Sequence, residues 1–122
     1  MMNINDALAM AEYAVSANPD RPATAIIHDS ADARLVVFRI ETRQAVPLHS
    51  STSSVILVII RGVGFVSGPV DGGVSEREVH QGTVVTYEPG EFHGMRATSG
   101  PFVVLAIIVP RPGSPRMQVA QQ

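Results

Sequence analysis

The chain has 122 residues, a mass of 13.0 kDa and a formal net charge of -2 at pH 7, which is enough for one folded domain. Its 45% of apolar and 16% of charged residues exclude an intrinsically disordered protein, and the absence of cysteine excludes disulfides, thiolate metal ligands and a cysteine nucleophile. Because the sequence has no cluster of basic residues, no signal-peptide pattern and no apolar run long enough to cross a bilayer, we expect a soluble, cytoplasmic protein without nucleic-acid or membrane partners.

The first residues of the chain carry a helical pattern. Apolar residues recur at steps of three and four residues, at Ile4, Leu8, Ala11 and Val15. Asn3 or Asn5 can cap the start of such a helix, and the pair Asn18-Pro19 ends it. We therefore expect residues 1–18 to form a helix that packs on the outside of a sheet.

From residue 23 onward, short β-rich runs alternate with turn signals. The predicted strands cover residues 24–28, 34–40, 45–49, 55–60, 63–66, 74–79, 83–87, 93–97 and 102–109. Turns are predicted, among other places, at Gly68-Pro69 and at Asp71-Gly72-Gly73. Nine short strands after one helix predict an antiparallel sandwich or barrel over residues 19–110, followed by an extended or disordered tail over residues 111–122.

Two of the predicted strands, residues 55–60 and 102–109, are apolar on both faces. One face of each can fill the core of a barrel, and the other face needs a cover as well. The N-terminal helix or a second copy of the chain can supply that cover. We expect a homodimer, because apolar outer faces and open sheet edges otherwise lead to aggregation.

Two stretches of the sequence resemble the two motifs of the cupins, which are small jelly-roll β-barrels. The first stretch runs from Val46-Pro47-Leu48-His49 to Arg61-Gly62-Val63-Gly64, and the second runs from Gln81-Gly82 to Glu91-Phe92-His93. Counted back from Gly62, the two histidines of the cupin motif fall on His49 and Ser51, its glutamate falls on Val55 and its opening glycine on Arg43. In the second motif Gly82, Gly90 and His93 match, whereas Glu88 and Ala97 replace the family's proline and asparagine.

The resemblance covers roughly residues 34–110 and implies a mainly β, cupin-type jelly-roll barrel with one N-terminal helix. It also implies a site for a divalent metal such as iron, manganese, zinc or nickel. Of the family's four ligand positions, this chain keeps His49 and His93, while Ser51 is a weak donor and Val55 is not a donor. Two imidazoles alone hold a metal loosely. Glu91 could join them, since a residue two positions before His93 points the same way in an extended strand.

The resemblance favours the binding of a small, largely apolar molecule with one polar group inside the barrel, near the two histidines. The residues expected to line that pocket are His49, Ser51, Val55, Leu57, Tyr87, His93 and Met95. The alternative is a divalent-metal-dependent enzyme (a dioxygenase, isomerase or decarboxylase) with an altered ligand shell, and a third possibility is a structural protein that acts through its dimer face.

The hydroxyl-rich run at residues 50–54 can bind a polar ligand, but a solvated turn is the favoured interpretation. Tyr87 can equally be a core residue, and His80 is expected at the end of the barrel opposite His93.

Overall fold

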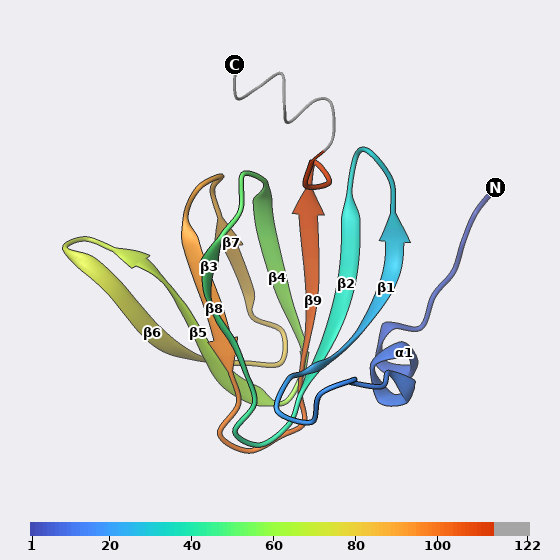
Figure 1. Ribbon diagram of the computed structural model, residues 1–122, viewed down its shortest axis with the longest axis horizontal. Coiled ribbons are helices and arrows are strands. Elements are labelled where there is room, and N and C mark those ends of the chain that lie inside the picture. Colours follow the sequence, from blue (N-terminus) through green and yellow to red (C-terminus); the bar gives the residue numbers. More distant parts are fainter. Residues whose placement is uncertain (114–122) are drawn as a thin grey trace.

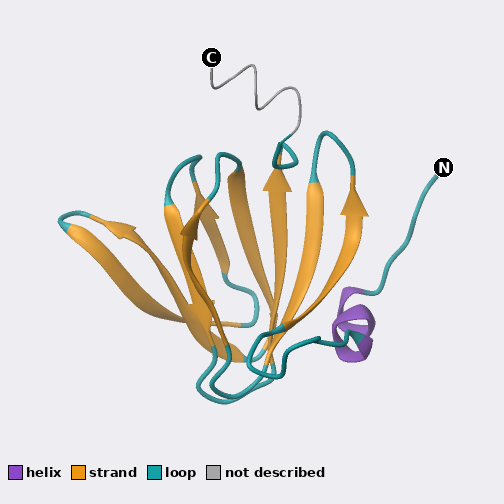
Figure 2. Cartoon of the chain, viewed as in Figure 1, coloured by secondary structure: helices purple, strands orange, loops and turns teal. Residues whose placement is uncertain are grey.

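The computed structural model describes residues 1–113, which form one short helix and nine strands (Figures 1 and 2). Helix α1 spans Ala7–Tyr13. The strands are β1 (Ala23–Asp29), β2 (Arg34–Ile40), β3 (Ala45–Ser50), β4 (Ser54–Arg61), β5 (Val63–Val70), β6 (Gly73–His80), β7 (Val84–Tyr87), β8 (Phe92–Arg96) and β9 (Phe102–Val109). The mainly β fold class predicted from the sequence is confirmed. No helix within the described residues is long and apolar enough to span a membrane.

The strands form two antiparallel sheets that face each other. The five-stranded sheet has the order β1-β2-β9-β4-β7 and the four-stranded sheet has the order β3-β8-β5-β6. The β3–β4 loop, the β7–β8 loop and the end of β9 all lie at the upper end of the molecule in Figure 1. The first two of these loops are joined by a backbone hydrogen bond of 2.7 Å from Gly90 to Ser51.

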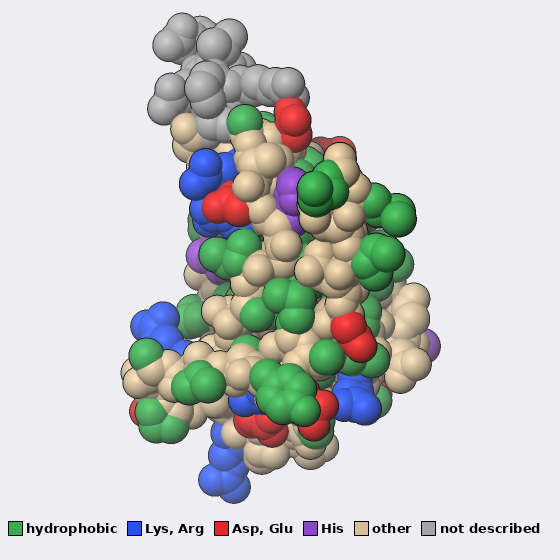
Figure 3. All heavy atoms as spheres, turned by 90° about the vertical axis from the view of Figure 1, so that its right-hand side faces the viewer, with side chains coloured by type: hydrophobic (Ala, Val, Ile, Leu, Met, Phe, Trp, Pro, Cys, Tyr) green, Lys and Arg blue, Asp and Glu red, His purple; other side chains and the backbone are tan. Residues whose placement is uncertain are grey.

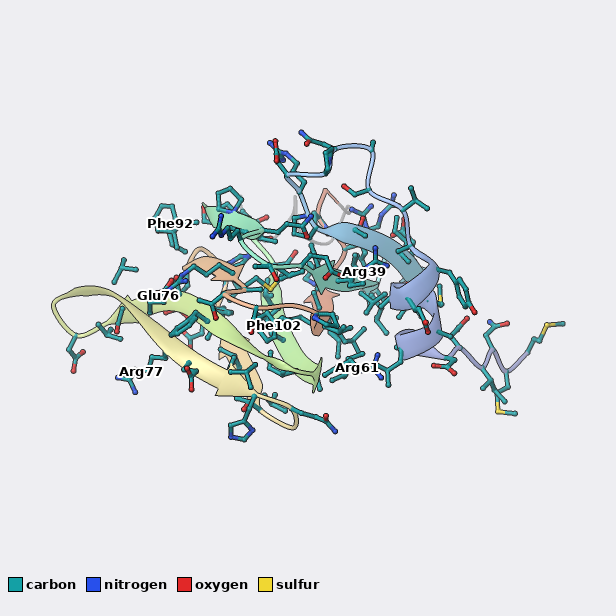
Figure 4. The ribbon with its side chains drawn as sticks, turned by 90° about the horizontal axis from the view of Figure 1, so that it is seen from below. Arg39, Arg61, Glu76, Arg77, Phe92 and Phe102 are labelled. Carbon is teal, nitrogen blue, oxygen red and sulfur yellow. The ribbon has the colours of Figure 1, made fainter. Side chains whose placement is uncertain are left out.

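The main core lies between the two sheets. Strand β4 shows how it is built, because its side chains alternate between the two faces of the sheet. Val55, Leu57 and Ile59 point inward and are buried, whereas Ile56 and Val58 point outward and are partly exposed. On β9, the Phe102 side chain is 0% exposed and lies between the sheets (Figure 4). Other large or central members of this core are Ile40, Val66, Met95, Val104 and Ala106.

Helix α1 is shorter than the sequence pattern predicts, and its cap differs. The N-cap is Asp6, whose carboxylate accepts a backbone hydrogen bond from three residues further on, so neither Asn3 nor Asn5 has this role. A carboxylate caps as well as an amide and also interacts favourably with the positive end of the helix. Ile4 and Val15 lie outside the helix and are 84% and 86% exposed, so they take no part in its buried stripe.

The helix packs on the outer face of the five-stranded sheet. Ala11 is its buried residue and forms a small second core with Val37 and Val103. Arg39, which lies between the helix and the sheet (Figure 4), donates hydrogen bonds to three backbone carbonyls at the C-terminal end of α1. These bonds satisfy groups that a helix end leaves unpaired, and they fasten the helix to β2.

The turn predicted at Gly68-Pro69 is wrong, because β5 continues through both residues to Val70. The chain reverses instead at Asp71-Gly72, the second of the predicted turns. A proline is tolerated in this strand because β8 pairs with β5 only over Phe65–Ser67, so β5 has a neighbour on one side alone at Pro69. Residues 114–122, most of the predicted tail, lie outside the described residues.

Candidate functional site

A cavity of about 630 Å³ lies between the two sheets. Its lining includes the β3–β4 loop, which is at the upper end of the molecule in Figure 1, and this end of the cavity is called its mouth. This volume falls within the range of small-molecule sites. Side chains from β2, β3, β4, β8 and β9 line it, together with the β3–β4 loop and one residue after β9. The lining residues are Phe38, Val46, His49, Ser50, Ser51, Thr52, Val55, Leu57, His93, Gly94, Met95, Ala106, Ile108 and Pro112.

The structure brings together most of the residues that the sequence singled out. Those that line the cavity are His49, Ser51, Val55, Leu57, His93 and Met95. Tyr87 does not line it. Its hydroxyl donates a hydrogen bond of 2.8 Å to the carbonyl of Ser67, and its ring lies 5.1 Å from that of His93. The Tyr87 ring therefore packs beside the His93 ring outside the cavity, and Tyr87 borders a neighbouring groove.

Several lining residues were missed from the sequence because they belong to strands far apart in the chain. On β9, Ile108 lies opposite Val55, and Ala106 lies opposite Leu57, so each pair shares the inner face of the sheet. Alternation along β9 from the buried Phe102 places both β9 residues on that face. The sequence therefore shows which face of β9 these residues share, but it does not show that β9 pairs with β4.

The two histidines meet at the mouth of the cavity. His49 on β3 and His93 on β8 are paired residues of adjacent strands, and their ring centroids lie 4.2 Å apart at an angle of 62°. His93 is 7% exposed, whereas His49 is exposed. The register between β3 and β8 shifts by one residue between Val46 and His49, and this bulge places His49 opposite His93.

Both imidazoles are oriented by the backbone. Nδ1 of His49 donates to the carbonyl of Pro47 at 2.8 Å, and Nδ1 of His93 donates to the carbonyl of Glu91 at 3.1 Å. Since a carbonyl can only accept, each neutral ring carries its hydrogen on Nδ1 and a lone pair on Nε2. Within residues 1–113 no hydrogen bond engages either Nε2, so each nitrogen is an acceptor without a partner in this part of the chain.

Burial sets the protonation of the inner groups. It lowers the pKa of His93; the hydrogen bond to the Glu91 carbonyl opposes this effect, and the nearby His49 adds to it. The neutral ring, with its free lone pair, is therefore the favoured form of His93. Burial also raises the pKa of Tyr87 to about 12, with a further contribution from the charge of Glu91, so the phenol remains a donor.

Glu91 does not join the two histidines as a third ligand. Its Oε1 accepts a hydrogen bond of 2.7 Å from the backbone N–H of Glu88, and its side chain borders the neighbouring groove beside Tyr87. The alternation that predicted a shared face fails because the Pro89-Gly90 turn comes directly before Glu91 and strand β8 begins only after it.

A firmly held divalent metal does not fit this set of donors. Among residues 1–113 no group of three or more His, Cys, Asp or Glu side chains could hold a metal ion. Of the positions that would complete a shell, Val55 has no donor, and Ser51 Oγ accepts a 3.1 Å hydrogen bond from the backbone N–H of Ser53. Two imidazoles fall short of the three protein ligands that divalent metal sites usually have.

The other two histidines lie away from the cavity. His28 bonds to Ser30 at the end of β1, and His80 bonds to the backbone carbonyl of Gln81 at the end of β6. Neither residue lines the cavity.

The arrangement of strands is shared with solved structures. An RmlC-like cupin protein from Desulfovibrio desulfuricans is similar over 91% of this chain and 99% of that chain, with 26% identity and a TM-score of 0.74. The chain belongs to the cupin superfamily. The protein TT1209 from Thermus thermophilus is similar over 91% of this cupin and 100% of the TT1209 chain, with 22% identity and a TM-score of 0.78. KdgF from Halomonas sp. is similar over 80% of this cupin and 87% of the KdgF chain, with 17% identity and a TM-score of 0.70.

A scan against protein-family models and a search of curated proteins give no match.

In this cupin the glycines of the two motifs have backbone conformations that favour glycine. Gly62, Gly82 and Gly90 all have positive φ angles, of 80°, 94° and 86°. At Gly62 a Cβ atom would also lie 2.4 Å from the carbonyl oxygen of Pro101. The turns of the family are thus preserved while half of its ligand positions are not.

Proposed function

We propose that this cupin binds a small, largely apolar molecule in the cavity between its two sheets. The single observation that carries the proposal is the division of the cavity wall. Apolar side chains line its interior, and the polar ones gather at the mouth, on β3, the β3–β4 loop and the start of β8. An apolar pocket with a few polar groups at one end is typical of small-molecule sites.

The interior of the cavity consists of side chains that gain by excluding water. They are Phe38, Val46, Val55, Leu57, Met95, Ala106 and Ile108. Each square ångström of apolar ligand surface that leaves water there contributes roughly 25 cal/mol, so a ligand with two fused rings can bind through this contact alone.

The proposal is tested with naphthalene and naphthol as probes, by following amide and methyl chemical shifts in NMR spectra. We expect shifts at cavity residues such as Leu57 and Ala106, with saturation in the micromolar to millimolar range. In a Ser51→Phe variant the larger side chain fills the mouth, and the shifts should disappear. Ser99→Phe is the matched control, because Ser99 is exposed in the turn at the opposite end of the sandwich.

The proposal fails if neither probe binds, or if the Ser51→Phe variant binds both as well as the wild-type protein does. Binding lost equally in Ser51→Phe and Ser99→Phe also counts against the cavity, because only the first variant alters it.

A second candidate is a divalent-metal-dependent enzyme, such as a dioxygenase, isomerase or decarboxylase, with His49 and His93 as the metal ligands. One observation favours it: both rings donate Nδ1–H to a backbone carbonyl, as metal-binding histidines usually do. The number of donors opposes it. Titration with Fe²⁺, Mn²⁺, Zn²⁺ and Ni²⁺ decides between the two, since tight binding raises the melting temperature and a His49→Ala/His93→Ala variant abolishes the effect.

We also propose that the chain forms a homodimer through the outer face of the five-stranded sheet. Ile56, Val58 and Val84 lie on that face and are not part of the core under α1; Val84 is 57% exposed. Figure 3 shows that hydrophobic side chains also reach the surface at the end of the molecule that carries β1 and α1. We expect Val58→Glu to give a monomer by light scattering without loss of folding, and a wild-type protein that stays monomeric at high concentration would refute the proposal.

A further inference from the structure

The polar mouth of the cavity has a specific donor and acceptor pattern. Both imidazoles use Nδ1 for a backbone carbonyl, which leaves an Nε2 acceptor on each of two rings whose centroids lie 4.2 Å apart. We infer that the polar group of the ligand is an uncharged hydroxyl, as in a phenol or alcohol, which donates to Nε2 of His49 or His93. This inference rests on the proposed function and names the chemical class of its ligand.

A hydroxyl also matches the third polar group at the mouth. Ser51 Oγ accepts a hydrogen bond from the backbone N–H of Ser53, so its own hydrogen is available to donate. A ligand oxygen that donates to an imidazole and accepts from Ser51 must be both donor and acceptor. A hydroxyl meets this requirement, whereas an ether or ketone oxygen can only accept.

A charged head group does not match the cavity. Among residues 1–113, none of those that line it is Asp, Glu, Lys or Arg. The basic residue next to the lining Pro112 is Arg111, whose guanidinium pairs with Asp29 at 2.9 Å. A carboxylate or phosphate at the mouth would face two imidazole lone pairs with no compensating cation from the described part of the chain, and an unpaired charge in such a position is costly.

The inference is tested with four probes of similar size that differ in one substituent: naphthalene, naphthol, methoxynaphthalene and naphthoate. Dissociation constants are measured by NMR titration at about pH 8, where the imidazoles of ordinary histidines are neutral. We expect naphthol to bind about tenfold more tightly than methoxynaphthalene, which is the effect of one net hydrogen bond. Naphthoate should bind more weakly than naphthalene.

Two variants separate the histidines from the apolar wall. His49→Leu/His93→Leu, which removes both acceptors, should abolish the preference for naphthol over methoxynaphthalene. His28→Leu removes an exposed histidine outside the cavity and should change nothing. A Tm within a few degrees of the wild-type value verifies that each variant keeps its fold.

The outcomes distinguish this inference from the proposed function. Equal affinities for naphthol and methoxynaphthalene, or tighter binding of naphthoate, overturn the hydroxyl inference while the apolar binding site stands. Failure of all four probes to bind overturns the proposed function itself.

Discussion

The first cupin-like stretch of the sequence ends at Gly64, which allows a quantitative prediction about the core. Gly64 lies on β5 with its Cα against the ring of Phe102. A Cβ built there would lie 2.3 Å from Cδ2 and 2.4 Å from Cε2 of that ring. Phe102 is 0% exposed, so its ring cannot move aside into solvent. Substitution Gly64→Ala therefore forces a shift of either the ring or the strand.

Overpacking of this kind costs about 2–3 kcal/mol, which lowers the Tm of a domain of this size by about 8–12 °C. The control is Gly72→Ala, where φ is +88° but no atom lies within 4 Å of the added Cβ. Backbone strain without crowding should cost about 1–2 kcal/mol there. Urea denaturation followed by circular dichroism gives the free energy of unfolding for each variant.

A double-mutant cycle identifies the ring as the cause. Phe102→Leu alone should cost about 1–2 kcal/mol, because it removes buried carbons. In Gly64→Ala/Phe102→Leu the smaller side chain makes room for the methyl group, so the double variant should be at least about 1 kcal/mol more stable than the sum of the two losses predicts. Strictly additive losses would refute the clash between these two residues and point to a backbone effect.

Three further predictions concern the site and its surroundings. Burial lowers the pKa of His93 below 6.5, so the unfolded chain binds a proton at this residue more readily than the folded protein does. The contribution of neutral His93 to stability is therefore complete above pH 6.5 and is lost as the pH falls through the pKa of the folded protein. The Tm of the wild-type protein should decline more steeply below about pH 6.5 than that of His93→Gln, and equal slopes would contradict this. In Tyr13→Phe, which leaves Tyr87 as the one tyrosine, absorbance at alkaline pH should show ionisation with a midpoint at about 12, and a midpoint near 10 would show that the phenol is not buried. Ser53→Ala leaves the Pro110 carbonyl without its 2.6 Å hydrogen bond inside the protein and should cost about 1–3 kcal/mol in urea denaturation, so a change below about 0.5 kcal/mol speaks against that bond.

The strands could be predicted from the sequence because their signals are local. Apolar and β-branched side chains mark the strands, and glycine-containing turns separate the strands from β4 to β9. The same local reasoning failed at Gly68-Pro69, which has the composition of a turn but lies in a strand that has one neighbour at that point. It also overestimated the helix, since Ile4 and Val15 fit a helical period without being held by any tertiary contact that buries them.

The site was predictable only in part. The family motifs single out His49 and His93 together, and the structure places their rings in contact. Motif spacing did not show that Glu91 turns back to cap the Pro89-Gly90 turn, or that Tyr87 points to Ser67. Those outcomes depend on where a turn ends and a strand begins, and a shift of one residue there reverses the face on which a side chain lies.

The meeting of the two histidines depends on such a shift. With continuous pairing from Val46 and Met95, the residue opposite His93 would be Leu48; the bulge moves His49 into that place. Pro47 lies inside the bulge, where the ladder hydrogen bond that it cannot donate is not required, and its carbonyl accepts the Nδ1 hydrogen of His49. One irregular residue in β3 therefore both brings the imidazoles together and orients one of them. The bulge thus accounts for the contact between two imidazole acceptors at the mouth of an apolar cavity.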